Sequence, residues 1–321
     1  MSKIMAKILP IRPRRRSRWP VLLLGELPEF SRLSALAVAA AFTLASCEAP
    51  QLVDPASSGS PAGDSGNVTL HFQPTTADVT RAAISGFFSK LNVQLFDAAG
   101  AKVFSQMKTQ QSSEPDFGSL SVALSPGTYT VVAVGHSSAN SATIKSPVDV
   151  RFTASNGEKL TDTFCHCSQI AVGDSPADFT LEMARATAMV QFVLTDTDIP
   201  AAFAYFKMEY TGGSANFNPT TLQGITKSTQ SEQRLRNSQM THQCYTFPYM
   251  ATTGTLKMTV SAIASDGTIL CSRTIDAVPV TRNRITTYTG PLFSEGTGEI
   301  TQTGFGFVVQ TDWEGEDRYE F

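Results

Sequence analysis

The sequence has few residues of the kinds that perform catalysis or bind metals. It contains four histidines in 321 residues, and His71, His136, His166 and His242 show no pairing that a catalytic triad requires. It also lacks a glycine-rich phosphate loop, an H-E-x-x-H motif and an acidic calcium loop. Residues 135–139, GHSSA, differ at one position from a G-x-S-x-G nucleophile motif, but no helical pattern follows, as that motif requires. The sequence predicts a protein that is not an enzyme and binds no cofactor.

Basic residues are scarce beyond the N-terminus. Residues 1–46 contain eight of the 25 basic residues but only two of the 28 acidic ones, so the rest of the chain has a net charge of −9. A nucleic-acid partner requires clustered Lys and Arg to neutralise phosphates. This charge therefore excludes nucleic acid as a partner.

Long apolar runs are also missing, and the one near the N-terminus is short. A basic cluster at residues 12–18 is followed by SALAVAAAFTLAS at residues 34–46, which is too short to span a membrane as a helix, since that takes about 20 residues. A basic region, an apolar run and small residues before a cleavage site are typical of a secretory signal peptide. Leu44 to Cys47 matches a bacterial lipobox, so we expect residues 1–46 to be a lipoprotein signal peptide and Cys47 to be lipidated. The long, interrupted leader indicates a start codon downstream of Met1.

Four further cysteines remain in the exported chain, which permits disulfides but does not require them. Cys165 and Cys167 flank His166, a spacing that resembles metal ligands. On a strand, however, Cys165 and Cys167 share one face while His166 points to the other. With no paired C-x-x-C, we expect no metal site and reduced cysteines on a half-buried strand. Cys244 and Cys271 have no assigned role.

A polar segment follows Cys47. Residues 48–66, EAPQLVDPASSGSPAGDSG, are dominated by Pro, Ser, Gly, Ala and Asp, and such a composition buries too little apolar surface to offset the entropy of ordering. As a flexible chain it spans roughly 25 Å. We expect residues 47–66 to be a lipidated cysteine and flexible tether.

From Val68 onward, apolar and polar residues alternate, which is the signature of half-buried strands. The pattern predicts strands at residues 68–72, 91–95, 120–124 and 129–133 in the first half, and at 188–194, 206–210 and 256–262 in the second. Turns are expected at Asp97–Gly100, at Pro126–Gly127 as type II, and at Asp266–Gly267 as a hairpin. No helical period appears. The fold class predicted is all-β.

Many short strands separated by turns favour two β-sandwiches. One strand ends and another begins within FTLEMARATAMVQFVL, so we place the boundary near Arg185. The predicted domains are an N-terminal β-sandwich at 67–185 and a C-terminal β-sandwich at 186–321. Residues 223–241, which are polar and rich in Ser, Gln and Arg, are expected to form a long surface loop.

Several phrases resemble a known family. The lipobox and the tether are followed by five segments that carry the resemblance: SKLNVQLFDAAGAKV, LSPGTYTVVAVGHSS, MARATAMVQFVLTDTDIP, MEYTGGSANFNPTT and VPVTRNRITTYTG. Together they are similar to the fimbrial anchor and accessory lipoproteins of Bacteroidales type V pili, the FimB-like family. The resemblance covers roughly residues 67–292. It implies two tandem transthyretin-like β-sandwich domains and a subunit that fixes or completes a fimbria at the cell outer membrane.

The resemblance also implies how such subunits join. In polymerising type V pilins, a trypsin-like protease removes the first strand after an Arg, and a neighbouring subunit donates a strand to the empty groove. The matching position here is Arg81. Cutting there would also remove Cys47 and its lipid, so for an anchor we expect Arg81 to be a solvated loop residue. Binding to pilin subunits would then use another edge, with the apolar run GFGFVVQ at 304–310 as one possibility and completion of the second sandwich as the other role for that run.

One alternative function stays open from the sequence. A lipid-anchored surface protein with sandwich domains could bind a glycan or a host protein in place of pilins. Binding modules of that type often expose aromatic residues in loops, whereas a pilus subunit needs an open groove or a donor strand.

Overall fold

The computed structural model describes residues 66–75, 84–153, 159–249, 253–293 and 315–320. In these ranges the chain forms strands β1 to β19 and no element that is a helix, so the all-β prediction is confirmed for the described residues. No helix among them is long and apolar enough to span a membrane.

The strands up to Arg185 are β1 (Val68–Pro74), β2 (Lys90–Phe96), β3 (Lys108–Gln111), β4 (Ser119–Val122), β5 (Gly127–His136), β6 (Thr143–Ser146), β7 (Asp149–Arg151), β8 (Phe164–Val172) and β9 (Ala177–Arg185). The strands after it are β10 (Ala188–Leu194), β11 (Phe203–Gly213), β12 (Asn216–Asn218), β13 (Gln223–Gly224), β14 (Ser228–Leu235), β15 (Thr241–Thr246), β16 (Thr253–Ala264), β17 (Ile269–Thr281), β18 (Arg284–Gly290) and β19 (Gly315–Glu320).

The first half is built on a seven-stranded sheet with the order β3-β2-β5-β8-β9-β1-β4. β8 and β9 pair only at Phe164–Arg185 and Cys165–Ala184, so the sheet opens there into two parts that face each other across one core. That core comes from residues 68–183 and includes Leu70, Phe88 and Val131. Alternating apolar residues on β1 and β5 point into it, as the period of two in their sequences predicts.

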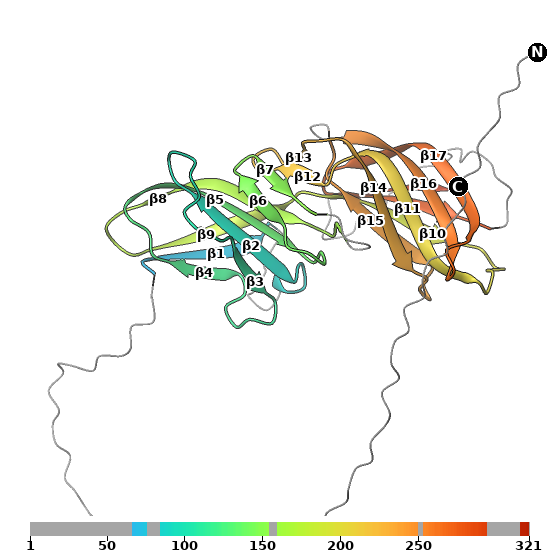
Figure 1. Cartoon of the computed structure of the whole chain (residues 1–321), viewed down its shortest axis with the longest axis horizontal. Coiled ribbons are helices and arrows are strands. Elements are labelled where there is room, and N and C mark those ends of the chain that lie inside the picture. The colour runs from blue at the N-terminus through green and yellow to red at the C-terminus, as the bar shows by residue number, and fades with distance from the viewer. Residues whose placement is uncertain (1–65, 76–83, 154–158, 250–252, 294–314, 321) are drawn as a thin grey trace, which may run out of the picture. The chain divides into compact units, whose positions relative to one another are not determined.

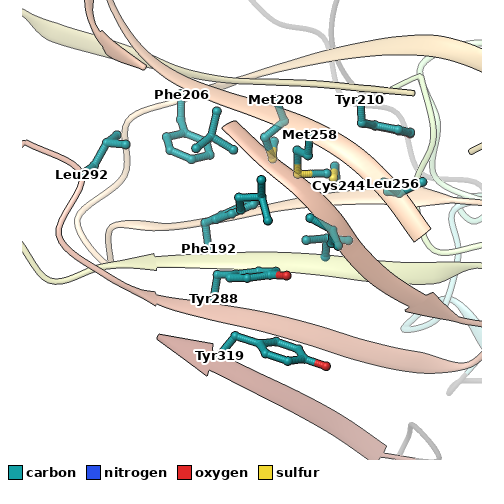
Figure 2. Packing of buried hydrophobic residues seen from close by; sticks show 14 of the residues in the cluster. Phe192, Phe206, Met208, Tyr210, Cys244, Leu256, Met258, Tyr288, Leu292 and Tyr319 are labelled. Carbon is teal, nitrogen blue, oxygen red and sulfur yellow. The ribbon is translucent and has the colours of Figure 1, made fainter. Parts of the chain in front are cut away.

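The second half has two four-stranded sheets, β15-β10-β18-β19 and β14-β11-β16-β17. Their facing sides enclose a core made from residues 188–319. Figure 2 shows this core, with Phe206, Met208 and Met258 on one side and Phe192 and Tyr288 on the other. Phe192 and Tyr288 stack with ring centroids 5.6 Å apart, and such offset aromatic pairs add to the energy of burial.

A fourth sheet, β13-β12-β7-β6, takes strands from both sides of Arg185. Phe217 of β12 pairs with Val150 of β7, and both side chains are fully buried in a third core cluster. β9 ends at Arg185 and β10 begins at Ala188, as the sequence predicts. The division into domains at 185/186 remains a prediction.

Two local predictions differ from the structure. Residues 223–241 are not a loop, because β14 runs through them and pairs with β11. This strand lacks apolar alternation, because its inward-facing residues are the polar Gln230, Glu232 and Arg234. Gly127 begins β5 and is not among the glycines with positive φ, so the type II turn is wrong.

The hairpin at Asp266–Gly267 is confirmed. Gly267 has φ +89°, and its N–H donates to the carbonyl of Ala264. The turn at Asp97–Gly100 is also confirmed, since the N–H of Gly100 donates to the carbonyl of Asp97 and Gly100 has φ +79°. Both positions suit glycine because it lacks the Cβ that penalises positive φ.

Candidate functional site: the first and last strands

The first strand lies inside its sheet. β1 pairs antiparallel with β4 and parallel with β9 (Figure 1). Val68, Leu70 and Phe72 are each at most 1% exposed and belong to the first core. Burying side chains of this size stabilises the fold by about 1.5–3 kcal/mol each. β1 is therefore an integral strand of this body.

Both ends of β1 are held by hydrogen bonds to neighbouring strands. At its start, the side-chain amide of Asn67 donates to the carbonyl of Leu124 at 2.9 Å and accepts from the N–H of Leu124 at 2.8 Å. At its end, the N–H and hydroxyl of Thr75 both donate to the carbonyl of Met183, at 3.0 and 2.9 Å. These bonds fix the register of β1 against β9.

The last strand occupies the end of a sheet in the second half. β19 pairs parallel with β18, which places Tyr319 opposite Tyr288. The two rings stack with centroids 5.1 Å apart and planes 24° apart, as Figure 2 shows. Tyr319 is 7% exposed and belongs to the second core. Backbone pairing with β18 and this aromatic stack both hold the six residues of β19.

The two halves meet close to the predicted boundary at the buried Arg185, which pairs with Asp162 of the first half and contacts Asn283 of the second. The Nε of Arg185 donates to both carboxylate oxygens of Asp162, at 2.9 and 3.0 Å. One of its Nη atoms donates to the side-chain oxygen of Asn283 at 2.9 Å, and the guanidinium lies 4.6 Å from the ring of Phe164. Thr187 donates a further hydrogen bond to Asp162. The strand that ends the first half is thereby joined to the β17–β18 connection.

Burial affects the pKa of Asp162. It raises the pKa of that carboxyl, while the adjacent Arg185 guanidinium acts in the opposite direction. A buried pair of this kind is costly to break, because the remaining charge has no compensation. No local sequence pattern marks the Arg185–Asp162 pair, although the predicted domain boundary falls near Arg185.

Neither of the two predicted site residues lies in the described part of the chain. Cys47 and Arg81 are both outside it, and so is the apolar run at 304–310. Lipidation of Cys47 and the state of Arg81 therefore remain predictions. β19 follows residues 294–314, which also lie outside the described ranges, and its sequence gave no alternating signal by which to find it.

The cysteines lie as the strand argument predicts. Cys165 is buried and Cys167 half-buried on the same side of β8, and both contact the third core cluster. His166 points the other way, with a ring nitrogen 2.7 Å from the carbonyl of Glu182. Cys165, Cys167, Cys244 and Cys271 are all free thiols. Among the described residues, no group of three or more His, Cys, Asp or Glu is placed to hold a metal ion.

The GHSSA segment has a structural role. The ring of His136 is 0% exposed, with Nε2 2.8 Å from the side-chain oxygen of Asn92, and Nδ1 accepts from the N–H of Ser138 at 3.1 Å. Burial, with a smaller contribution from Lys90, lowers the pKa of His136 to about 3. The imidazole is therefore neutral and fully used in hydrogen bonds, an arrangement that positions a loop.

Comparison with known proteins identifies a family. A family model described as fimbrillin-A associated anchor proteins Mfa1 and Mfa2 matches residues 57–317. A search of curated proteins finds no match.

Two solved structures are similar to parts of this chain. The fimbrial anchor protein Mfa2 from Porphyromonas gingivalis is 13% identical with a TM-score of 0.36, over 64% of this chain and 80% of that one. A fimbrial assembly protein from Parabacteroides distasonis is 12% identical with a TM-score of 0.38, over 71% and 92%. On the family match over residues 57–317, this chain belongs to the family of fimbrillin-A associated anchor proteins.

Proposed function

We propose that this protein is a lipid-anchored, non-enzymatic subunit that attaches a fimbria to the outer membrane. The observation that carries the proposal is the position of β1, between β4 and β9 with its apolar side chains in the core. A subunit that keeps this strand also keeps the segment that leads back to Cys47. A covalent path from a lipid to a folded body is what an anchor requires.

In this proposal the protein does not receive a donor strand in its first half, because β1 fills that position. Contact with a pilin subunit uses a different edge. β19 ends the sheet β15-β10-β18-β19, and the end strand of a sheet presents backbone groups to which another chain can pair. The proposed partner is a pilin that pairs with β19 by main-chain hydrogen bonds.

Membrane attachment is tested by changing the lipidated residue. Cys47→Ala removes the acyl chains, each buried CH₂ of which contributes about 0.8 kcal/mol to membrane binding. We expect the variant to leave the membrane fraction, to incorporate no labelled palmitate, and to release fimbriae from the cells. Cys271→Ala, which removes a half-buried thiol on β17, serves as the matched control and should stay attached.

Unchanged membrane fractionation of Cys47→Ala, with palmitate labelling equal to that of the wild type, would contradict the lipid anchor. If the variant is released in folded form but the fimbriae stay on the cells, the lipid anchor is supported and the anchoring of fimbriae is contradicted.

A further inference from the structure

A cleft lies between the two halves of the described body. Its volume is about 610 Å³, within the range of pockets that hold small ligands. Residues of the first half supply one wall, among them Phe87, Ser137 and Thr161, and residues of β14 and β15 supply the other. Other lining residues include Asp162, Gln233, Arg234, Leu235, Gln243 and Tyr245.

The charges in this cleft are already paired. Arg234 donates to Glu232 at 2.8 Å, and that glutamate side chain is 1% exposed. Asp162 is paired with Arg185 at 2.9 Å. Each positive group is thus matched by a negative one within hydrogen-bond distance. A ligand that carried a net charge would find no uncompensated opposite charge among these residues, so the lining favours a neutral ligand.

The polar groups that line the cleft have hydrogen-bond donors and acceptors available for a ligand. The side-chain amide of Gln233 is exposed and makes no hydrogen bond with any described residue. Ser137 accepts from the N–H of Ser89 at 3.0 Å, which leaves its own O–H to donate. Only one Nη of Arg234 is bonded within the described ranges. These groups can supply both donors and an acceptor to a ligand in the cleft.

Apolar surface lies next to these polar groups. Phe87 is half-buried, with its ring against Phe164 at 5.7 Å. The half-buried ring of Tyr245 is held at its hydroxyl by Gln243 at 3.4 Å. Leu235, which also lines the cleft, is 70% exposed. A ligand suited to this lining has hydroxyl groups on its edges and C–H groups on its faces.

We propose that this cleft binds a neutral oligosaccharide. Sugar rings combine apolar faces with hydroxyls that both donate and accept, and the amide, hydroxyl and guanidinium groups of the cleft match that pattern without requiring charge. This activity is separate from the attachment of the fimbria, because none of these residues belongs to β1 or β19.

The test uses the folded mature protein on an array of neutral oligosaccharides from mannan, xylan, galactan and dextran, with sialylated and sulfated glycans as the acidic arm. We expect binding to one or more neutral glycans, confirmed by calorimetry. Gln233→Ala and Ser137→Ala should each weaken that binding about fivefold to tenfold, since one hydrogen bond contributes about 1 kcal/mol. The control Gln169→Ala removes an exposed amide on β8 outside the cleft and should bind as the wild type does.

Both substituted side chains are exposed, so each variant should fold as the wild type does. Thermal melting of each variant checks this. Binding confined to the acidic arm, no binding to any glycan, or binding that Gln233→Ala and Ser137→Ala leave unchanged would each overturn the proposal. Saturation of the cleft by an extended peptide with no glycan binding would also overturn it, and would assign the cleft to a protein partner.

Discussion

Burial lowers the pKa values of two histidines, His136 and His242. His136 is enclosed by Asn92, Ser138 and Ala142, and both ring nitrogens are engaged in the neutral form. His242 stacks on Phe206 with centroids 4.6 Å apart, and burial lowers its pKa to about 4. Protonating either ring requires a charge to be placed in an apolar setting.

The first prediction concerns His136. Its pKa falls from 6.5 in the unfolded chain to about 3 in the fold, so below pH 6.5 the unfolded state binds more protons than the folded one. Stability should decrease from pH 6.5 down to about pH 3, by up to about 1.4 kcal/mol for each pH unit. His136→Gln should be less stable at pH 7 but should lose less stability on acidification.

Urea midpoints measured between pH 7 and pH 4 test this dependence. Gln169→Ala, which removes an exposed amide of β8 that does not titrate, is the control and should keep the slope of the wild type. Equal slopes for His136→Gln and the wild type would show that another group causes the acid sensitivity.

At the scale of the elements, the terminal strands differ in how they are held. β1 has neighbours on both sides and three side chains in the core, whereas β19 ends its sheet and depends on Tyr319. A strand with one partner contributes fewer hydrogen bonds to the sheet, so the two ends should tolerate truncation differently. β19 is the element whose loss we expect the body to survive.

Tyr319→Ala should lower the free energy of unfolding by about 3 kcal/mol, because it removes a buried aromatic ring from the second core. Tyr205→Ala on β11, where the side chain is half-buried, should cost clearly less. Denaturant unfolding of the two variants gives the comparison. Similar losses for both would mean that Tyr319 does not anchor β19.

Deleting residues 315–321 tests the proposed pilin contact. The truncated protein should fold with a lower melting temperature and should no longer co-purify with pilin subunits, because the edge offered by β19 is gone. A truncated protein that still binds pilins would contradict pairing at β19, and pairing would then be sought at another end strand, such as β14.

At the scale of the whole molecule, the described body consists of two cores joined by shared structure. The sheet β13-β12-β7-β6 crosses the predicted boundary, and the N–H of Leu160 donates to the buried Glu232 at 3.3 Å. The Arg185–Asp162 pair adds a charged contact at the same junction. Stability of the body should therefore depend on this junction as well as on the two cores.

Asp162→Asn should lower the free energy of unfolding by about 3 kcal/mol, because Arg185 would remain buried without its counter-charge. The exposed pair between Lys257 and Asp276, with both side chains 62% exposed, provides the contrast. Lys257→Ala should change stability by less than about 0.5 kcal/mol. Calorimetry of both variants compares them, and equal effects would show that the junction pair adds nothing beyond a surface ion pair.

Local sequence patterns determined the strands that have apolar alternation, among them β1, β2, β10 and β16, together with the Asp266–Gly267 hairpin. The sequence also predicted that the side chains of Cys165 and Cys167 lie on the same face of their strand. These features depend on residues close together in the chain, whose periodicity and turn preferences act before any distant contact forms. The same local phrases carried the resemblance to fimbrial anchors that the family match bears out.

Only the tertiary structure decided the features that depend on distant partners. β14 forms although its inward residues are polar, because Lys159 and Leu160 of the first half supply hydrogen bonds to Gln230 and Glu232. β19 forms because β18 and Tyr288 offer it a sheet edge and an aromatic ring. Arg185 is buried because Asp162 and Asn283 meet it from elsewhere in the chain. In each case a residue's environment is set by segments tens of residues away, which no local pattern encodes.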